Sequence, residues 1–304
     1  MNQLISRLTR PALATLLALV GCGWTARAVD AQALLPYTLP LDEERLTATG
    51  LTLAQEAAQL AQFQQYEEAL ARIQLAAQLA PRDPQILALM GSLHLQVGDS
   101  AAAVTTLESA KRISSDDPVI WFTLGSAYFS EAKYLQSANA LEKGLSLEPG
   151  NPGAHFDLGN AYYKLNRYEK AIEQYESAVS FNELFWPAIN NIGLVLYEMG
   201  QLEPAIEHWE RSLEVSDEEP EPTLAIAAAR YAANINRPAA IESATAALER
   251  DSRYADIKFL EDNLWGTRLL SATEAMFGTP GLQDVLSGLY GGSHSNDVHH
   301  NHNH

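Results

Sequence analysis

The sequence predicts an all-α solenoid of stacked helical hairpins, and three series of residues repeating every 34 positions predict it. The first series is glycine, at Gly91, Gly125, Gly159 and Gly193. The second is a small residue, at Ala69, Ala103, Ser137, Ala171, Ala205 and Ala239. The third is an acid or amide before proline, at Asp83-Pro84, Asp117-Pro118 and Asn151-Pro152. A fixed period of this length indicates a repeat architecture.

Each repeating residue type has a structural reason. Asp or Asn before Pro starts a helix, because the side chain caps free N–H groups and Pro presets the backbone of the first turn. A glycine inside a helix costs about 1 kcal/mol relative to Ala, which is reasonable where a second helix must come close. The small-residue series lies on that second helix, after a turn such as Val97-Gly98-Asp99. One hairpin cannot bury its own apolar face, so the hairpins must stack.

Six units without insertions or deletions follow from this register. They are residues 50–83, 84–117, 118–151, 152–185, 186–219 and 220–253, named units one to six below. Units one and six are less regular, because Ala57 and Ala227 stand where the other units have Gly. Terminal repeats are often atypical because they cap the stack.

The units resemble the tetratricopeptide repeat (TPR). Trp121, Leu124, Gly125 and Tyr128 fit its first helix, as do His155, Leu158, Gly159 and Tyr162, and Ala171, Tyr175 and Ala178 fit its second. The resemblance covers residues 50–253 and implies a right-handed superhelix of about six helical hairpins. Residues 254–280 are interpreted as a degenerate seventh unit that caps the stack. Ile257, Leu260 and Leu264 hold its core positions, Glu261 replaces the glycine, and Pro280 is expected to end it.

The TPR resemblance also implies where a partner protein binds, because the first helices of TPR proteins line a concave groove for a peptide or helix. The matching positions predict an aromatic groove with amide groups, formed by Phe122, Ser126, Phe129, Phe156, Asn160, Tyr163, Lys164, Asn190, Asn191, Tyr197 and Tyr231. Asn160 and Asn191 match half of the carboxylate clamp of chaperone-binding TPRs. Phe156 replaces its first Lys, so capture of a chaperone tail is not expected.

Residues 1–33 are interpreted as a signal peptide, lipoprotein signal or membrane anchor. Arg7 and Arg10 precede an apolar stretch at 11–20, which is typical of an export signal. Cys22 ends a lipobox-like sequence and is a candidate lipidation site, while Ala28 and Ala33 end alternative cleavage sites. An uncleaved anchor is the remaining possibility. Each interpretation puts residues 34–304 on the exported side of a membrane, in a periplasm or thylakoid lumen, with residues 34–49 as a linker.

Composition narrows the classes of function. The net charge of -18 argues against nucleic-acid binding, and the single cysteine excludes an internal disulfide. No catalytic or nucleotide-binding motif is present, so neither an enzyme nor a cofactor is expected. The acidic run at 217–222 is interpreted as a solvated turn, or alternatively as a contact for a basic partner. Residues 281–304 are expected to be a disordered tail, and divalent metal could bind its His294, His299, His300, His302 and His304.

The sequence thus predicts a non-catalytic scaffold at a membrane. Residues 32–44 and 60–81 resemble cyanobacterial and chloroplast TPR proteins of thylakoid biogenesis, of the type that interacts with protochlorophyllide oxidoreductase. That resemblance implies an assembly or pigment-biosynthesis factor at photosynthetic membranes. A lipobox before six TPR units also resembles the lipoproteins that assist assembly of a pilus secretin. A periplasmic metal-binding protein using the histidine tail is a third possibility.

Overall fold

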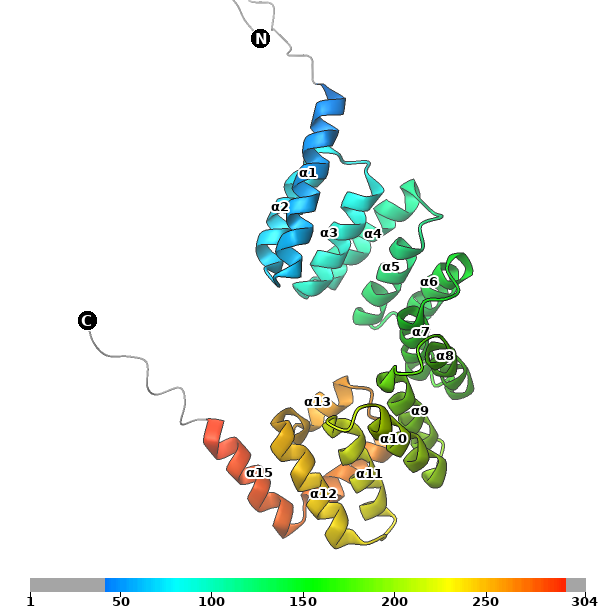
Figure 1. The fold of residues 1–304 in the computed structure, drawn as a ribbon, viewed down its shortest axis with the longest axis vertical. Coiled ribbons are helices and arrows are strands. Elements are labelled where there is room, and N and C mark those ends of the chain that lie inside the picture. Colours follow the sequence, from blue (N-terminus) through cyan, green and yellow to red (C-terminus); the bar gives the residue numbers. More distant parts are fainter. Residues whose placement is uncertain (1–41, 294–304) are drawn as a thin grey trace, which may run out of the picture. The chain divides into compact units, whose positions relative to one another are not determined.

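The computed structural model describes residues 42–293, which contain helices and no strands. Six helical hairpins follow one another along the chain, each beside the next (Figure 1). They are α1 (Glu43–Gln62) with α2 (Tyr66–Leu79), α3 (Pro84–Gln96) with α4 (Ser100–Ile113), α5 (Pro118–Ser130) with α6 (Tyr134–Leu147), α7 (Pro152–Lys164) with α8 (Tyr168–Phe181), α9 (Trp186–Glu198) with α10 (Leu202–Val215), and α11 (Pro220–Ala232) with α12 (Arg237–Arg250). The C-terminal segment, residues 251–293, follows with η1 (Ser252–Ala255), α13 (Ile257–Asp262), α14 (Thr267–Phe277) and α15 (Pro280–Ser293).

The expected helix starts are confirmed. The Asp83 carboxylate accepts hydrogen bonds from the N–H groups of the two residues after Pro84, both at 3.0 Å. Asp117 caps α5 through the Val119 N–H at 3.0 Å, and Asn151 caps α7 at the same distance. These caps fix where the first helix begins in units two, three and four.

The repeating glycines lie where the two helices of a hairpin touch, as expected. A Cβ atom built on any of the four would lie 2.5 Å from a large side chain on the second helix. The pairs are Gly91 with Leu107, Gly125 with Leu141, Gly159 with Tyr175, and Gly193 with Trp209. The large side chain stands at the same position of the second helix in every pair, so the sequence period records a repeated helix contact.

The structure differs from expectation at both ends of the solenoid. Helix α1 begins at Glu43 after the cap Asp42, so residues 43–49, expected in the linker, are helical. Helix α15 begins at Pro280 and continues to Ser293, so residues 281–293, expected in a disordered tail, are helical as well. Pro280 starts this helix because proline fits the first helical position. Cys22 and the five tail histidines lie outside the described residues.

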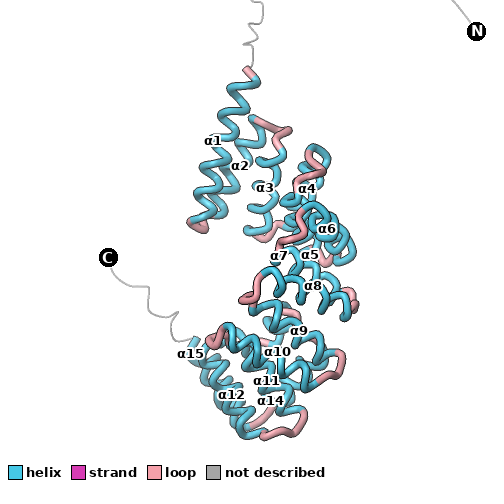
Figure 2. Tube along the Cα trace, turned by 45° about the vertical axis from the view of Figure 1, so that its right-hand side comes forward, coloured by secondary structure: helices cyan, strands magenta, loops and turns pink. Residues whose placement is uncertain are grey.

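The C-terminal segment does not form a seventh hairpin. Helix α13 is short and ends where Leu264 takes a left-handed backbone conformation, with φ 68°. The chain then turns back, and α14 packs against α11 and α9, the first helices of units six and five. Figure 2 shows α14 beside α11. Within residues 42–293, no helix has both the length and the apolar character needed to cross a membrane.

Candidate functional site

The candidate site is the groove face, defined here as the side of the solenoid formed by the first helices α1, α3, α5, α7, α9 and α11. Over units five and six this face is covered. Every residue from Ala188 to Tyr197 in α9 is buried, and so is most of α11. On unit three it is partly exposed, because Phe122, Ser126 and Phe129 are only half-buried. The groove face is therefore divided into an open and a covered part.

The expected groove aromatics of units three and four pack within the solenoid. Phe122 lies against Gly144, where an added Cβ would be 2.5 Å from its ring. The Phe129 ring is 5.3 Å from that of Tyr134. Phe156 lies between Tyr175 and Phe185, with ring centroids 5.7 and 5.3 Å away. Farther along, the Arg237 guanidinium covers the Tyr231 ring at 4.6 Å.

Three expected groove residues meet the C-terminal segment. Tyr163 and Tyr197 are only 7% and 5% exposed. The Arg268 guanidinium lies 5.3 Å above the Tyr197 ring, and the Tyr163 hydroxyl adjoins Gly266 so closely that a Cβ there would be 2.5 Å from it. Lys164 lines the pocket beside this contact. Burial raises the pKa of both tyrosines, so their hydroxyls stay protonated near neutral pH.

The expected amide groups form a hydrogen-bonded chain along α7 and α9. The Asn160 Oδ1 accepts from the Tyr175 hydroxyl at 2.8 Å and from Asn191 Nδ2 at 3.1 Å. Asn190 Nδ2 in turn donates to Asn191 Oδ1 at 3.3 Å. Next to this chain, the Ser126 hydroxyl donates to Asp157 at 2.9 Å, and burial raises the pKa of the Asp157 carboxyl. The structure thus brings the three asparagines together, with Asn190 and Asn191 buried and Asn160 partly buried.

Glu221 ends this network, and the interpretation of residues 217–222 as a solvated turn is wrong at this position. Its side chain is buried and accepts a hydrogen bond from Trp265 Nε1 at 3.0 Å. Burial raises the pKa of Glu221 to about 7, although hydrogen bonds from Trp265 and Asn190 oppose the shift. The acidic run alone does not indicate this burial, because Trp265 lies 44 positions farther along the chain.

Glu198 anchors the start of α14. Its two carboxylate oxygens accept the N–H groups of Arg268 at 3.1 Å and Leu269 at 3.0 Å. Gly266, the cap residue of α14, has no side chain that could satisfy these N–H groups. A carboxylate at a helix N-terminus is also favoured by the helix dipole. Glu198 therefore supplies from unit five the cap that the C-terminal segment lacks.

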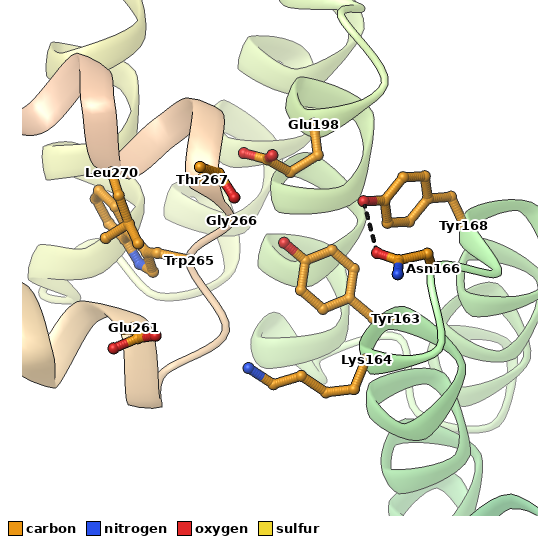
Figure 3. A pocket seen from close by; sticks show the side chains of 10 residues that line it. All are labelled: Tyr163, Lys164, Asn166, Tyr168, Glu198, Glu261, Trp265, Gly266, Thr267 and Leu270. Atoms are coloured by element: carbon orange, nitrogen blue, oxygen red, sulfur yellow. Dashed lines mark hydrogen bonds between the residues drawn. The ribbon is translucent and has the colours of Figure 1, made fainter. Parts of the chain in front are cut away.

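A pocket of 210 Å³ remains between unit four and the C-terminal segment. Figure 3 shows Tyr163 and Lys164 on one side of it, and Glu261, Trp265 and Thr267 on the other. The Tyr168 hydroxyl hydrogen-bonds Asn166 at its edge. Among residues 42–293, no group of three or more His, Cys, Asp or Glu side chains is arranged to hold a metal ion.

Sequence reasoning missed Glu198, Glu221, Trp265, Gly266 and Arg268. The sequences of α9 and α11 do indicate that this part of the groove face is covered, because both helices are apolar around most of their circumference. Leu194, Ala225 and Ala228 stand at positions that face the groove in the TPR pattern. A helix that is apolar on all sides is buried on all sides, so a covering element could have been anticipated.

Comparison with known proteins supports the repeat assignment. The chain matches the tetratricopeptide-repeat family over residues 122–186 and again over 188–216. A solved structure of MamA (residues 41 to end) from Desulfovibrio magneticus RS-1 is 22% identical, with a TM-score of 0.51, covering 58% of this chain and 96% of that chain. A second MamA crystal structure is 20% identical, with a TM-score of 0.51, covering 58% and 94%. The curated proteins include no match.

Identities of this size show a shared fold. The family matches lie in units three to five, and the observed helical hairpins extend the same pattern to all six units. Residues 122–186 and 188–216 therefore match tetratricopeptide repeats, and the chain has the all-α fold of a TPR solenoid.

Proposed function

We propose that this protein is a non-catalytic scaffold that holds a partner protein on the open part of its groove face, at a photosynthetic (thylakoid) membrane. The observation that carries the proposal is the partly exposed groove face of α3 and α5. Half-buried Leu89, Ser92, Phe122 and Phe129 combine apolar contact area with hydroxyl groups there. Such a mixture suits an extended peptide or an amphipathic helix.

Affinity purification from cross-linked membranes tests the groove. Gln96 and Ser130 are exposed and stand at equivalent groove positions of units two and three, so a Gln96→Arg/Ser130→Arg variant adds bulk and charge without touching the core. Thr105 and Gln136 are exposed on the second helices, and Thr105→Arg/Gln136→Arg is the matched control. We expect the groove variant to lose the partners and the control to keep them. Equal recovery with both would place binding elsewhere.

The identity of the partners tests the narrower assignment. The thylakoid role is supported by the likeness of residues 32–44 and 60–81 to TPR proteins of thylakoid biogenesis. Recovery of photosystem or chlorophyll-synthesis proteins would support it. Recovery of pilus or outer-envelope components would instead favour the alternative, an envelope lipoprotein that assists assembly of a secretion complex.

The lipoprotein alternative rests on the position of the only cysteine, Cys22, after an apolar stretch. Replacing Cys22 with Ser blocks acylation and leaves the apolar stretch unchanged. Membrane fractionation of this variant separates the two cases. Release from the membrane supports a lipid anchor at Cys22, whereas retention supports attachment through residues 1–33 themselves.

A further inference from the structure

We propose that the covered groove face of units four to six is a second binding surface, for a helical segment of a partner protein, which the chain's own residues 264–277 occupy and can vacate. This proposal deepens the scaffold function and rests on it. The own-chain occupant, called the docked segment below, shows what the surface recognises. Residues 264–277 come from outside the repeats, yet α14 contacts the first helices α9 and α11, which form the groove face.

The docked segment makes three specific polar or steric contacts in succession. The Trp265 indole donates to the buried Glu221 carboxyl. Gly266 passes between Glu198 and the Tyr163 hydroxyl, where no side chain fits. The first N–H groups of α14 then meet the Glu198 carboxylate. A matching partner needs an aromatic N–H donor, then a glycine, then the start of a helix.

The rest of α14 supplies an apolar stripe. Its buried residues recur at helical spacing on one face, and they are Leu269, Ala272, Thr273, Met276 and Phe277. This is the pattern by which an amphipathic helix binds a groove. The partner class is therefore an amphipathic helix preceded by an aromatic–glycine pair.

Several features of this contact favour release of the docked segment. Glu221 loses its hydration, and the Asn190 Oδ1 is buried without a hydrogen-bond partner in the described part of the chain. Leu264 holds a left-handed backbone conformation that leucine rarely adopts. Each feature disfavours the docked state, and none is part of the repeated glycine contacts within the hairpins.

A peptide-binding experiment on the full chain tests the proposal. Gly266→Val prevents the docked segment from binding the groove, because a side chain at this position collides with Glu198 and Tyr163. The substitution leaves the residues of the groove itself unchanged. The probe is a fluorescein-labelled peptide of residues 262–279, and the readout is fluorescence anisotropy. We expect the Gly266→Val chain to bind this peptide at least tenfold more tightly than the wild-type chain, whose groove is occupied.

Two controls define the site. A peptide carrying Gly266→Val should not bind, because it cannot pass between Glu198 and Tyr163. The Gly266→Val chain with an added Glu198→Lys change should no longer bind the wild-type peptide. Lysine cannot accept the N–H groups of α14, and its positive charge is repelled by the positive end of the helix dipole. Failure of the Gly266→Val chain to bind the peptide, with circular dichroism and α7–α10 hydrogen-exchange protection intact, would overturn the proposal.

Hydrogen exchange of the wild-type chain provides a test without a substitution. We expect the amides of α14 to exchange through an opening that leaves α9 and α11 protected. If the amides of α14 exchanged only when those of α9 and α11 also exchanged, the docked segment would be a permanent cap, and the proposal would be overturned. These results are independent of the Gln96→Arg/Ser130→Arg experiment, which probes α3 and α5, so either proposal can fail without the other.

Discussion

At the scale of single residues, the four repeated glycines set how closely the two helices of a hairpin approach. Gly159 faces the fully buried ring of Tyr175, which is held by Asn160 and Phe156 and cannot move aside. The partner differs between units, being Leu, Tyr or Trp, while the glycine stays constant. The missing side chain on one helix therefore makes room for a large one on the other.

Helix α7 offers a matched pair of glycines to test this. Gly159→Ala should lower the free energy of unfolding by about 1–3 kcal/mol, because its Cβ would lie 2.5 Å from Tyr175. Gly153→Ala should be neutral or stabilising by up to about 1 kcal/mol, since Gly153 is exposed and an added Cβ meets only Asn151 at 3.4 Å. Urea unfolding measures both, and equal effects would contradict the packing role.

Glu221 makes the stability of the folded chain depend on pH, and the stability falls as the pH rises. Its pKa rises from 4.5 to about 7 because of burial, and Glu219 adds repulsion in the same direction. A raised folded-state pKa contributes stability that is complete below about pH 4.5 and is lost as the pH rises through about 7. Glu221→Gln keeps the acceptor for Trp265 but cannot ionise.

We therefore expect the melting temperature of the wild-type chain to fall relative to Glu221→Gln between pH 5 and pH 8. Thermal unfolding followed by circular dichroism across this range measures the difference. A constant difference between the two chains over the whole range would show that Glu221 does not titrate in this window.

At the scale of elements, hydrogen bonds join hairpins to the ones before them at a recurring place in the repeat. The Tyr128 hydroxyl donates to Glu108 at 2.6 Å, the Tyr162 hydroxyl to Glu142, and Arg230 to Glu210 at 2.6 Å. Each donor lies on a first helix, and each acceptor lies on the second helix of the preceding unit. Burial and Glu108 raise the pKa of Tyr128 to about 12, so the donor is protonated at neutral pH.

A double-mutant cycle on Tyr128 and Glu108 measures the strength of this link. Tyr128→Phe should cost about 1 kcal/mol, the usual net value of a hydrogen bond to a partly buried acceptor. The second variant is Glu108→Ala, which removes the acceptor, and the cycle separates this bond from the ion pair that Glu108 also makes with Lys111. A coupling energy near zero would mean that the hairpins are joined by apolar packing alone.

The elements that could be predicted from sequence are those that repeat. The sequence period reports contacts between neighbouring helices, so the hairpins, their caps and the glycine contacts were all predictable. Contacts across the repeats were not, because Glu198 and Arg268 lie far apart in the chain and belong to no periodic series. Arg268 covers the ring of Tyr197, a predicted groove residue, and the repeat pattern contains no information about that contact.

At the scale of the whole described solenoid, the core is not evenly distributed. One continuous apolar core extends from α6 to α15 and includes Leu158, Ile189, Leu224 and Leu269. The first two and a half hairpins bury smaller, separate clusters, such as the one around Ile73. Helix α14 contributes to this difference in units five and six, because it contacts both α9 and α11 and adds a third layer there. We therefore expect the free energy of unfolding to be a sum of single-hairpin and nearest-neighbour terms only for the first hairpins, which lack the additional layer.

Two core truncations of similar size should reveal this division. Ile73 and Leu224 are both fully buried, and replacing either with Ala should cost about 2–5 kcal/mol. Ile73→Ala should speed hydrogen exchange in α1–α4 and leave α9–α14 protected, because only neighbouring hairpins connect the two regions. Leu224→Ala should speed exchange throughout α9–α14, because the docked α14 shares one core with both units. If Leu224→Ala affected only α11 and α12, the C-terminal segment would contribute no coupling, and units five and six would behave like the independent hairpins before them.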